Sequence, residues 1–374
     1  MQTVNRQARL EKMQRIIRES GYDAAALVPG PTLTYLTGVR FELSERPLVL
    51  FIRAEAGSDP AMIVPLLETP RIEAAAPFTI AYYVYTDAQG YRPAFDEACT
   101  GLALSGKKIA VEALKMRVLE SHLIEHYSPG CTITLADHDL IRTRVHKEPA
   151  EVEAMRQAIR LSEAALDATL PQIRSGMTER QAMRILLDEM ADRGSQSNAF
   201  DPIVLTGPKS AQPHGEPGDE VIKAGDLLLF DFGASVGGYP ADITRTFAVG
   251  QVDPELVRVY EVVRAANEAG IQAARPGMVA QDLDRIVRKV IHDAGYGPQF
   301  IHRTGHGLGL DIHEGPNIVE GNTQILEPGM VFTIEPGIYL PDKGGVRIED
   351  NVTITETGAE VLTSYPRALR VIGE

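Results

Sequence analysis

A strand pattern that ends in an acidic residue occurs twice in the second half of the 374-residue chain. The first copy spans residues 223–233 and the second spans residues 327–337, and each is an apolar run followed by a carboxylate and then a glycine. The carboxylate is Asp231 in the first copy and Glu335 in the second. Because segments that share such a pattern are expected to fold alike, the sequence predicts a duplicated strand unit.

Each copy is followed by another acidic residue across a pair of glycines. Asp242 follows the glycines at 237 and 238, and Glu349 follows those at 344 and 345. We expect a hairpin to bring the two carboxylates of each copy side by side. Buried carboxylates that lie together are unfavourable unless a cation neutralises them, so the four acidic residues predict a metal site.

The helical segments around these strands repeat as well. Seven residues of the segment 174–194 are identical to the residues 101 positions later in the segment 275–295, and a pattern typical of a long helix precedes each copy. Thr178 with Gln181 has the spacing of a capping box, which predicts a helix start in the first copy. We therefore predict an α+β domain of two helix–helix–hairpin units in one pseudo-twofold sheet with helices on one face. The two carboxylate pairs would meet on the axis.

Residues 1–143 alternate between helix-like and strand-like segments, which favours a separate α/β domain. The helix candidates span 9–20, 67–76, 94–104 and 117–126, and the strand candidates span 24–28, 48–52, 61–64, 80–85 and 108–111. The polar run at 142–149 marks the boundary. The two domains are therefore predicted at 1–143 and 144–374.

The composition excludes several classes of protein. A net charge of −14 argues against nucleic-acid binding, because such proteins present a basic surface. Cys99 and Cys131 have a spacing that fits neither a disulfide framework nor a thiolate zinc site. The first residues lack the apolar core of a signal peptide, and no segment has the roughly 18 consecutive apolar residues of a membrane span. We therefore expect a cytoplasmic protein with no nucleic-acid or membrane partner.

His306 lies in the glycine-rich segment 305–309, where small neighbours allow a metal or substrate to approach closely. One imidazole with four carboxylates favours Mn²⁺, with Co²⁺ or Fe²⁺ as alternatives, over a structural zinc site. Two divalent ions would balance the charge of four carboxylates. A His-x-x-Glu-His pattern at 122–126 also has the spacing of a helix-borne zinc motif, but it lacks an evident third ligand and is interpreted as a half-exposed helix.

Together these motifs resemble the pita-bread metallopeptidases, specifically the branch of prolidases and Xaa-Pro aminopeptidases. The matching segments, in the order of that family, are Pro-His-Gly at 213–215, Asp-Phe-Gly at 231–233, Asp-Ile-Thr-Arg-Thr at 242–246, Gly-His-Gly-Leu-Gly at 305–309, His-Glu-Gly-Pro at 313–316, Glu-Pro-Gly at 335–337 and Arg-Ile-Glu-Asp at 347–350. Tyr-Leu-Thr-Gly at 35–38 resembles part of the smaller creatinase-like domain of these enzymes. The resemblance implies a C-terminal pita-bread fold with an N-terminal α/β creatinase-like domain.

The resemblance also implies a site for two divalent ions, with Mn²⁺ favoured and Co²⁺, Fe²⁺ or Zn²⁺ as alternatives. The implied metal ligands are Asp231, Asp242, His306, Glu335 and Glu349. Asp242 and Glu349 would bridge both ions, and Glu335 would also act as general base or proton shuttle in peptide hydrolysis. His214 and His313 would contact the scissile peptide and stabilise the oxyanion.

The implied activity is that of an exopeptidase that cleaves between an N-terminal residue and proline. We favour a dipeptidase (prolidase), with an aminopeptidase that acts on longer peptides as the alternative. A dipeptidase needs a cation for the free carboxylate of its substrate, and where some prolidases carry an arginine after the His-Glu-x-Pro block, this chain has Asn317. Arg347, Arg46 and Arg40 are candidates for this contact, and pairing with the metal site is the other interpretation of Arg347.

Two further classes of protein with the same fold are alternatives. Methionine aminopeptidases do not explain the N-terminal domain. Catalytically inactive or metal-free members of the fold, which act as binding modules or creatine hydrolases, would have broken ligand positions, and none is broken in this sequence. The family expectation for assembly is a homodimer.

Overall fold

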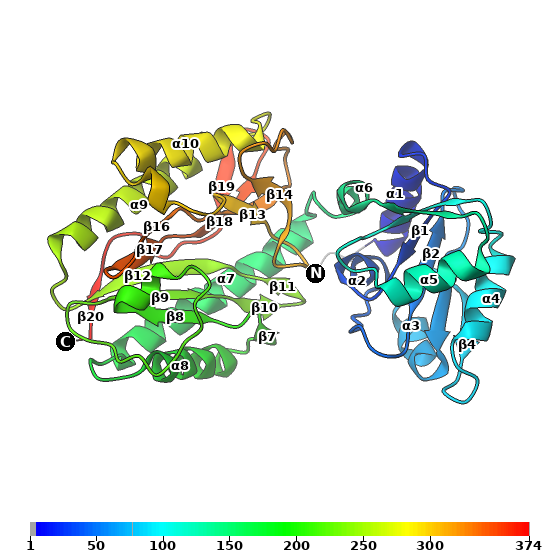
Figure 1. The fold of residues 1–374 in the computed structure, drawn as a ribbon, viewed down its shortest axis with the longest axis horizontal. Coiled ribbons are helices and arrows are strands. Elements are labelled where there is room, and N and C mark those ends of the chain that lie inside the picture. Colours follow the sequence, from blue (N-terminus) through cyan, green and yellow to red (C-terminus); the bar gives the residue numbers. More distant parts are fainter. Residues whose placement is uncertain (1–4, 77, 374) are drawn as a thin grey trace. The chain divides into compact units, whose positions relative to one another are not determined.

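The structure is a computed structural model that describes residues 5–76 and 78–373. The chain divides into two compact units, Met1–Arg144 and Val145–Glu374 (Figure 1). Among the described helices, none combines the length and the apolar character that crossing a membrane requires.

The N-terminal unit is built on a six-stranded sheet with the strand order β4-β3-β2-β1-β5-β6. The strands are β1 (Ala24–Leu27), β2 (Val49–Arg53), β3 (Ala61–Pro65), β4 (Ala81–Tyr85), β5 (Lys108–Val111) and β6 (Thr132–Leu135). The helices are α1 (Arg6–Glu19), α2 (Pro31–Thr37), α3 (Thr69–Ala75), α4 (Arg92–Gly101), α5 (Val118–Tyr127) and α6 (Asp137–Leu140). Every residue of β1 is buried, as expected for a central strand covered on both faces. The predicted α/β character of this region is confirmed.

Three elements of this unit, α2, β6 and the short α6, were not predicted from the sequence. The proline-rich turn after β1 leads directly into α2, with Pro31 at its first position, where a helix needs no backbone N–H donor. The edge strand β6 alternates polar and apolar residues over only four positions, and its side chains are exposed or half-buried throughout.

The C-terminal unit contains the two predicted repeats. The first comprises α7 (Pro149–Thr169), α8 (Glu179–Asp192), β8 (Ile203–Thr206), β9 (Leu227–Phe232) and β12 (Ile243–Val249). The second comprises α9 (Pro254–Ala273), α10 (Ala280–Asp293), β13 (Gly305–Gly307), β15 (Val331–Ile334) and β18 (Asp350–Ile354). Shorter strands complete the unit: β7 (Ser197–Asn198), β10 (Ala234–Val236), β11 (Tyr239–Pro240), β14 (Glu314–Ile318), β16 (Gly337–Leu340), β17 (Gly344–Arg347), β19 (Ala359–Val361) and β20 (Val371–Ile372).

The main strands form two sheets, whereas the sequence suggested a single pseudo-twofold sheet. The orders are β20-β12-β9-β8 in one sheet and β14-β13-β15-β18-β19 in the other. The sheets are connected where the Glu349 amide donates to the Thr244 carbonyl at 3.1 Å and the Thr246 hydroxyl donates to the Arg347 carbonyl at 3.0 Å. In Figure 1, α7 and α8 lie next to the strands of the first repeat, and α9 and α10 lie next to those of the second.

Both predicted hairpin pairings are present. β9 pairs antiparallel with β12, and β15 pairs antiparallel with β18. Asp231 lies within β9 and Asp242 lies one residue before β12, while Glu335 follows β15 and Glu349 precedes β18. The four carboxylates therefore come from the strand ends where the two sheets meet.

Candidate metal centre

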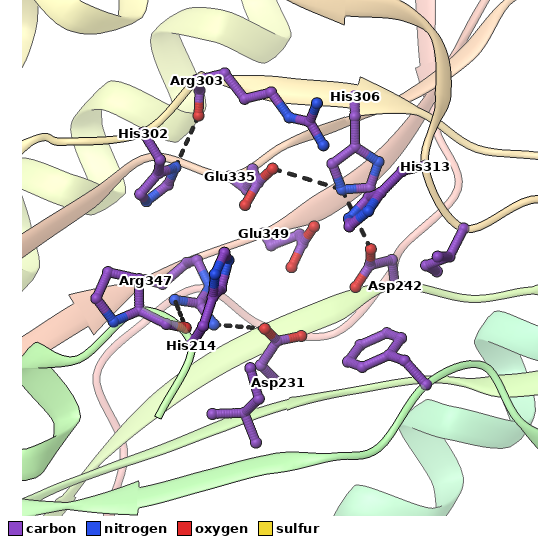
Figure 2. A pocket seen from close by; sticks show the side chains of 14 residues that line it. His214, Asp231, Asp242, His302, Arg303, His306, His313, Glu335, Arg347 and Glu349 are labelled. Carbon is purple, nitrogen blue, oxygen red and sulfur yellow. Dashed lines mark hydrogen bonds and ion pairs between the residues drawn. The ribbon is translucent and has the colours of Figure 1, made fainter. Parts of the chain in front are cut away.

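The strand ends of both repeats surround one cavity of about 410 Å³ (Figure 2). Its lining consists of Phe200, Ile203, Pro213, His214, Asp231, Asp242, His302, Arg303, His306, Ile312, His313, Glu335, Arg347 and Glu349. All five predicted metal ligands and both predicted substrate histidines belong to this set. Residues as far apart in sequence as Phe200 and Glu349 thus share one site.

The tightest group of candidate metal ligands is formed by Asp242, His306 and Glu349. One ligand atom from each lies within 4.8 Å of the others. His306 Nε2 is 3.4 Å from Asp242 Oδ2 and 3.5 Å from Glu335 Oε1. His306 Nδ1 lies 3.2 Å from the Gly307 carbonyl, which assigns the proton to Nδ1 and leaves the Nε2 lone pair directed at the carboxylates.

Burial and the neighbouring charges shift the pKa values of this group. Burial, together with the neighbouring carboxylates, raises the pKa of Asp242 and of Glu349 well above their ordinary values. Burial also raises the pKa of Glu335 to about 8, although Arg347 opposes the shift. Burial and the nearby His313 lower the pKa of His306, so its imidazole is neutral, as a metal ligand must be.

Asp231 provides a direct test of whether a metal ion fits. One of its carboxylate oxygens pairs with Arg347, and the other, Oδ1, is buried without any hydrogen-bond partner among the described residues. Buried carboxylate oxygens normally have a hydrogen-bond partner. Because the described residues provide none for Oδ1, this atom is suited to bind a cation. A donor set rich in carboxylate oxygens, with one imidazole, matches the preference of divalent ions such as Mn²⁺.

The carboxylates are held by a second layer of hydrogen bonds. The Thr244 hydroxyl donates to Glu349 Oε2 at 2.6 Å, and Arg347 Nε donates to the same hydroxyl at 3.1 Å. Arg245 is fully buried and donates to the Glu349 carbonyl at 2.6 Å and to Asp350 Oδ1 at 2.7 Å. Arg245 therefore holds the backbone of Glu349 in place, in agreement with its interpretation as a structural residue.

The histidines of the cavity differ in their surroundings. The ring of His313 meets the ring of His306 edge-on, with the centroids 4.3 Å apart. His302 Nδ1 donates to the Arg303 carbonyl, and His302 Nε2 accepts from the Tyr339 hydroxyl, both at 2.8 Å. Burial, aided by the charge of Arg347, lowers the pKa of His302 to about 4, which keeps this ring neutral.

The predicted substrate arginines lie in different units. Arg347 lines the cavity, where it pairs with Asp231 and donates to the Tyr339 hydroxyl at 2.8 Å. This arrangement favours the interpretation of Arg347 as a partner of the metal site. Arg46 belongs to the N-terminal unit, where its guanidinium bonds both oxygens of Asp87 at 2.9 Å. Contact between Arg46 and substrate stays a prediction.

Sequence reasoning missed two polar residues of the site. Arg303 precedes His306 by three positions and lines the cavity, and Tyr339 joins His302 to Arg347. Their proximity to the motif segments was the available signal. The pattern did not indicate their orientation, because it depends on contacts with residues distant in sequence, Asn317 for Arg303 and His302 for Tyr339.

Comparisons with known proteins agree with this geometry. The sequence model of Metallopeptidase family M24 matches residues 153–356, and that of the Creatinase/Prolidase N-terminal domain matches residues 9–146. The Xaa-Pro dipeptidase of Lactobacillus delbrueckii subsp. lactis is 34% identical and covers 97% of this chain and 98% of its own.

Solved structures of two relatives also align over nearly the whole chain. A dipeptidase from Pyrococcus horikoshii OT3 is 38% identical with a TM-score of 0.91, covering 97% of this chain and 100% of its own. An X-Pro aminopeptidase from Thermotoga maritima MSB8 is 32% identical with a TM-score of 0.84, covering 97% and 99%. These relatives include both kinds of exopeptidase considered from the sequence.

Proposed function

Because the chain belongs to metallopeptidase family M24 and carries the creatinase/prolidase N-terminal domain, we propose that it hydrolyses the bond between an N-terminal residue and a following proline, with dipeptides as preferred substrates. The observation that carries the proposal is the cavity in which four carboxylates and one imidazole from both repeats converge beside three further histidines. Cleavage of longer peptides, as in an Xaa-Pro aminopeptidase, is the alternative.

Two divalent ions, with Mn²⁺ favoured, would be held by the residues that converge on the cavity: Asp231, Asp242, His306, Glu335 and Glu349. Support comes from the unsatisfied Oδ1 of Asp231 and from the close approach of Asp242, His306 and Glu349. Bound divalent ions supply Lewis-acid polarisation of a carbonyl and lower the pKa of water.

The remaining steps belong to side chains of the cavity. Glu335 is the proton acceptor and donor, because its buried carboxylate lies 3.5 Å from His306 at the centre of the site. His214 and His313 bind the scissile peptide and donate hydrogen bonds to the oxygen on which charge develops. Arg347 fixes the orientation of Asp231, and Arg46 is retained as a candidate for substrate contact.

A preference for dipeptides is supported by the relatives named dipeptidase that each cover 97% of this chain. Assembly as a homodimer, which is the family expectation, and a cytoplasmic location, which is the expectation from the sequence, belong to the same proposal.

The proposal is tested with metal-stripped protein reloaded with Mn²⁺ or Co²⁺ and assayed on Met-Pro, Met-Pro-Ala and Met-Ala. We expect metal-dependent release of methionine from Met-Pro, slower release from Met-Pro-Ala, and little from Met-Ala. Equal or faster cleavage of Met-Pro-Ala would favour the aminopeptidase. Absence of metal-dependent cleavage of both proline peptides would reject the enzyme proposal and favour a binding module.

A further inference from the structure

Two arginines, Arg303 and Arg347, line the cavity, and they differ in how many of their N–H donors already have a partner in the protein. Arg347 is only 3% exposed, and its guanidinium donates to Asp231, to the Tyr339 hydroxyl and to the Thr244 hydroxyl. An arginine held in this way cannot turn to a substrate without leaving a buried charge behind, which is strongly unfavourable. Arg347 is therefore unsuited to bind a substrate carboxylate.

Arg303 is in the opposite situation. It is half-buried, and among the described residues the only recorded side-chain partner of its guanidinium is the neutral amide of Asn317, whose Oδ1 accepts from Nη1 at 2.8 Å. In Figure 2 the guanidinium points toward His306 and Glu335.

The backbone that carries Arg303 is firmly anchored. Arg288 donates to the Phe300 carbonyl at 3.0 Å and to the His302 carbonyl at 2.9 Å. The Arg303 carbonyl accepts from His302, and the next residue, Thr304, donates from its hydroxyl to Asp284 at 2.7 Å. A side chain on such a fixed segment can bind a ligand at a defined place with little additional ordering.

The chemistry of a dipeptide requires such a cation. Its free C-terminal carboxylate must enter a cavity that already contains four carboxylates, and an arginine compensates this charge with two directed donors. Asn317 accepts one N–H of Arg303 without adding charge. An arginine at 317 would instead place a second cation beside Arg303.

We propose that Arg303, oriented by Asn317, binds the free C-terminal carboxylate of dipeptide substrates and so determines the preference for dipeptides over longer peptides. This inference rests on the proposed Xaa-Pro peptidase activity and names the residue that selects the substrate length.

The test compares substrates that differ only in this charge. Met-Pro and its amide, Met-Pro-NH₂, are assayed with the Mn²⁺-loaded wild-type enzyme and the Arg303→Gln and Asn317→Asp variants. Arg285→Gln is the matched control, because Arg285 pairs with Glu320 on the surface and does not line the cavity. Asn317→Asp keeps Arg303 but places a carboxylate against it, so it tests the same charge by another change.

We expect Arg303→Gln to raise the KM for Met-Pro by roughly 10- to 100-fold, the range typical of lost hydrogen bonds to charged groups. The kcat should change little, and both parameters for Met-Pro-NH₂ should stay close to those of the wild type. Asn317→Asp should shift the KM in the same direction, and Arg285→Gln should match the wild type on both substrates. Inhibition by L-proline should weaken in Arg303→Gln, whereas inhibition by L-prolinamide should not.

An equal loss on Met-Pro and Met-Pro-NH₂, or no loss on Met-Pro, would overturn the role of Arg303 while leaving the peptidase activity intact. A wild-type enzyme that cleaves neither substrate would reject the proposed function itself, and the inference with it. The two failures are therefore distinguishable.

Discussion

The two repeats of the C-terminal unit share backbone contacts at matching positions and differ in the side chains that they bring to the site. In the first, the Gly176 amide donates to the Ile222 carbonyl, and in the second the Gly277 amide donates to the Leu326 carbonyl, both at 2.8 Å. The isolated bridges Thr178–Val221 and Val279–Ile325 occupy matching places. The hydrogen bonding of the repeats is thus preserved where it builds the fold.

The side chains on matching strands have diverged. In the first repeat, Leu205 on β8 lies opposite Leu229, which is two residues before Asp231. At the matching place in the second repeat, the amide of His306 on β13 donates to the hydroxyl of Thr333, which is two residues before Glu335. The same strand position therefore carries a buried leucine in one repeat and the imidazole of the site in the other. A symmetric scaffold supports an asymmetric site.

The repeats also depend on each other at the site. Arg347 of the second repeat pairs with Asp231 of the first, and Thr244 of the first donates to Glu349 of the second. Neither repeat contains a complete set of ligands and their supporting partners. The contacts that the repeats share position the strands of the site, and the side chains that differ between them provide its chemistry.

Truncating the side chains at the position that carries Leu205 in one repeat and His306 in the other has the largest expected effect on activity. His306→Ala removes a candidate ligand, and we expect activity on Met-Pro to fall by more than about 100-fold, since loss of a residue that merely supports a ligand costs 10- to 100-fold. Leu205→Ala should leave activity per folded molecule near wild type and lower the free energy of unfolding by about 2–5 kcal/mol. Similar activity losses in both variants would contradict the asymmetry.

The glycines beside the carboxylate strands should respond alike in both repeats. A Cβ at Gly233 would lie 1.8 Å from the Ala241 carbonyl oxygen, and one at Gly305 would lie 1.8 Å from that of Thr333. We expect Gly233→Ala and Gly305→Ala each to lower the free energy of unfolding by about 3 kcal/mol or more, measured by urea denaturation. Gly358→Ala, with no atom within 4 Å of its added Cβ, is the control and should change stability little.

The pH dependence of the metal-free protein tests the shared burial of the carboxylates. The pKa of Glu335 is raised to about 8 in the folded protein from an ordinary value of 4.5, and that of Asp242 is raised well above 3.8. A raised carboxyl pKa means that the folded state binds protons more tightly than the unfolded state, so stability is present at low pH and lost as pH rises through the folded-state pKa.

The melting temperature of metal-free protein should therefore fall between about pH 5 and 8. Asp242→Asn in the first repeat and Glu335→Gln in the second should each reduce this slope. Added Mn²⁺ should oppose the fall, because metal binding strengthens as its ligands deprotonate. A metal-free melting temperature that rises over this interval would contradict the burial of these groups.

The smallest expected effect concerns helix starts. Thr178 and Gln181 form a capping box at α8, whereas Val279, at the matching start of α10, makes no side-chain cap. Thr178→Ala should lower the free energy of unfolding by about 1 kcal/mol, and Val279→Thr should raise it by no more than that amount. No loss of stability in Thr178→Ala, or a loss in Val279→Thr, would show that the two starts are not distinguished by their caps.

Much of this architecture was predictable because it depends on local patterns that occur twice. The capping box at Thr178 and the strand carboxylates Asp231 and Glu335 follow from spacing and apolar runs alone. The α/β character of the N-terminal region followed from alternation in the same way.

Other features depend on contacts between distant segments and left no local signal. The strands were expected in one sheet and form two, because the join near Thr244 and Glu349 is made by a few hydrogen bonds rather than by a continuous ladder. The pairing of Arg347 with Asp231 arises only once the two repeats are packed together, and the orientation of Arg303 depends on its hydrogen bond to Asn317.

Metal binding to variants from each repeat tests most directly whether both repeats form one metal site. Mn²⁺ binding to metal-stripped wild type, Asp242→Asn and Glu349→Gln is measured by calorimetry together with Met-Pro hydrolysis. If both repeats form one site, each single variant should lose high-affinity Mn²⁺ binding and activity together. Wild-type affinity and turnover in either variant would show that one repeat suffices, and would contradict a site shared between them.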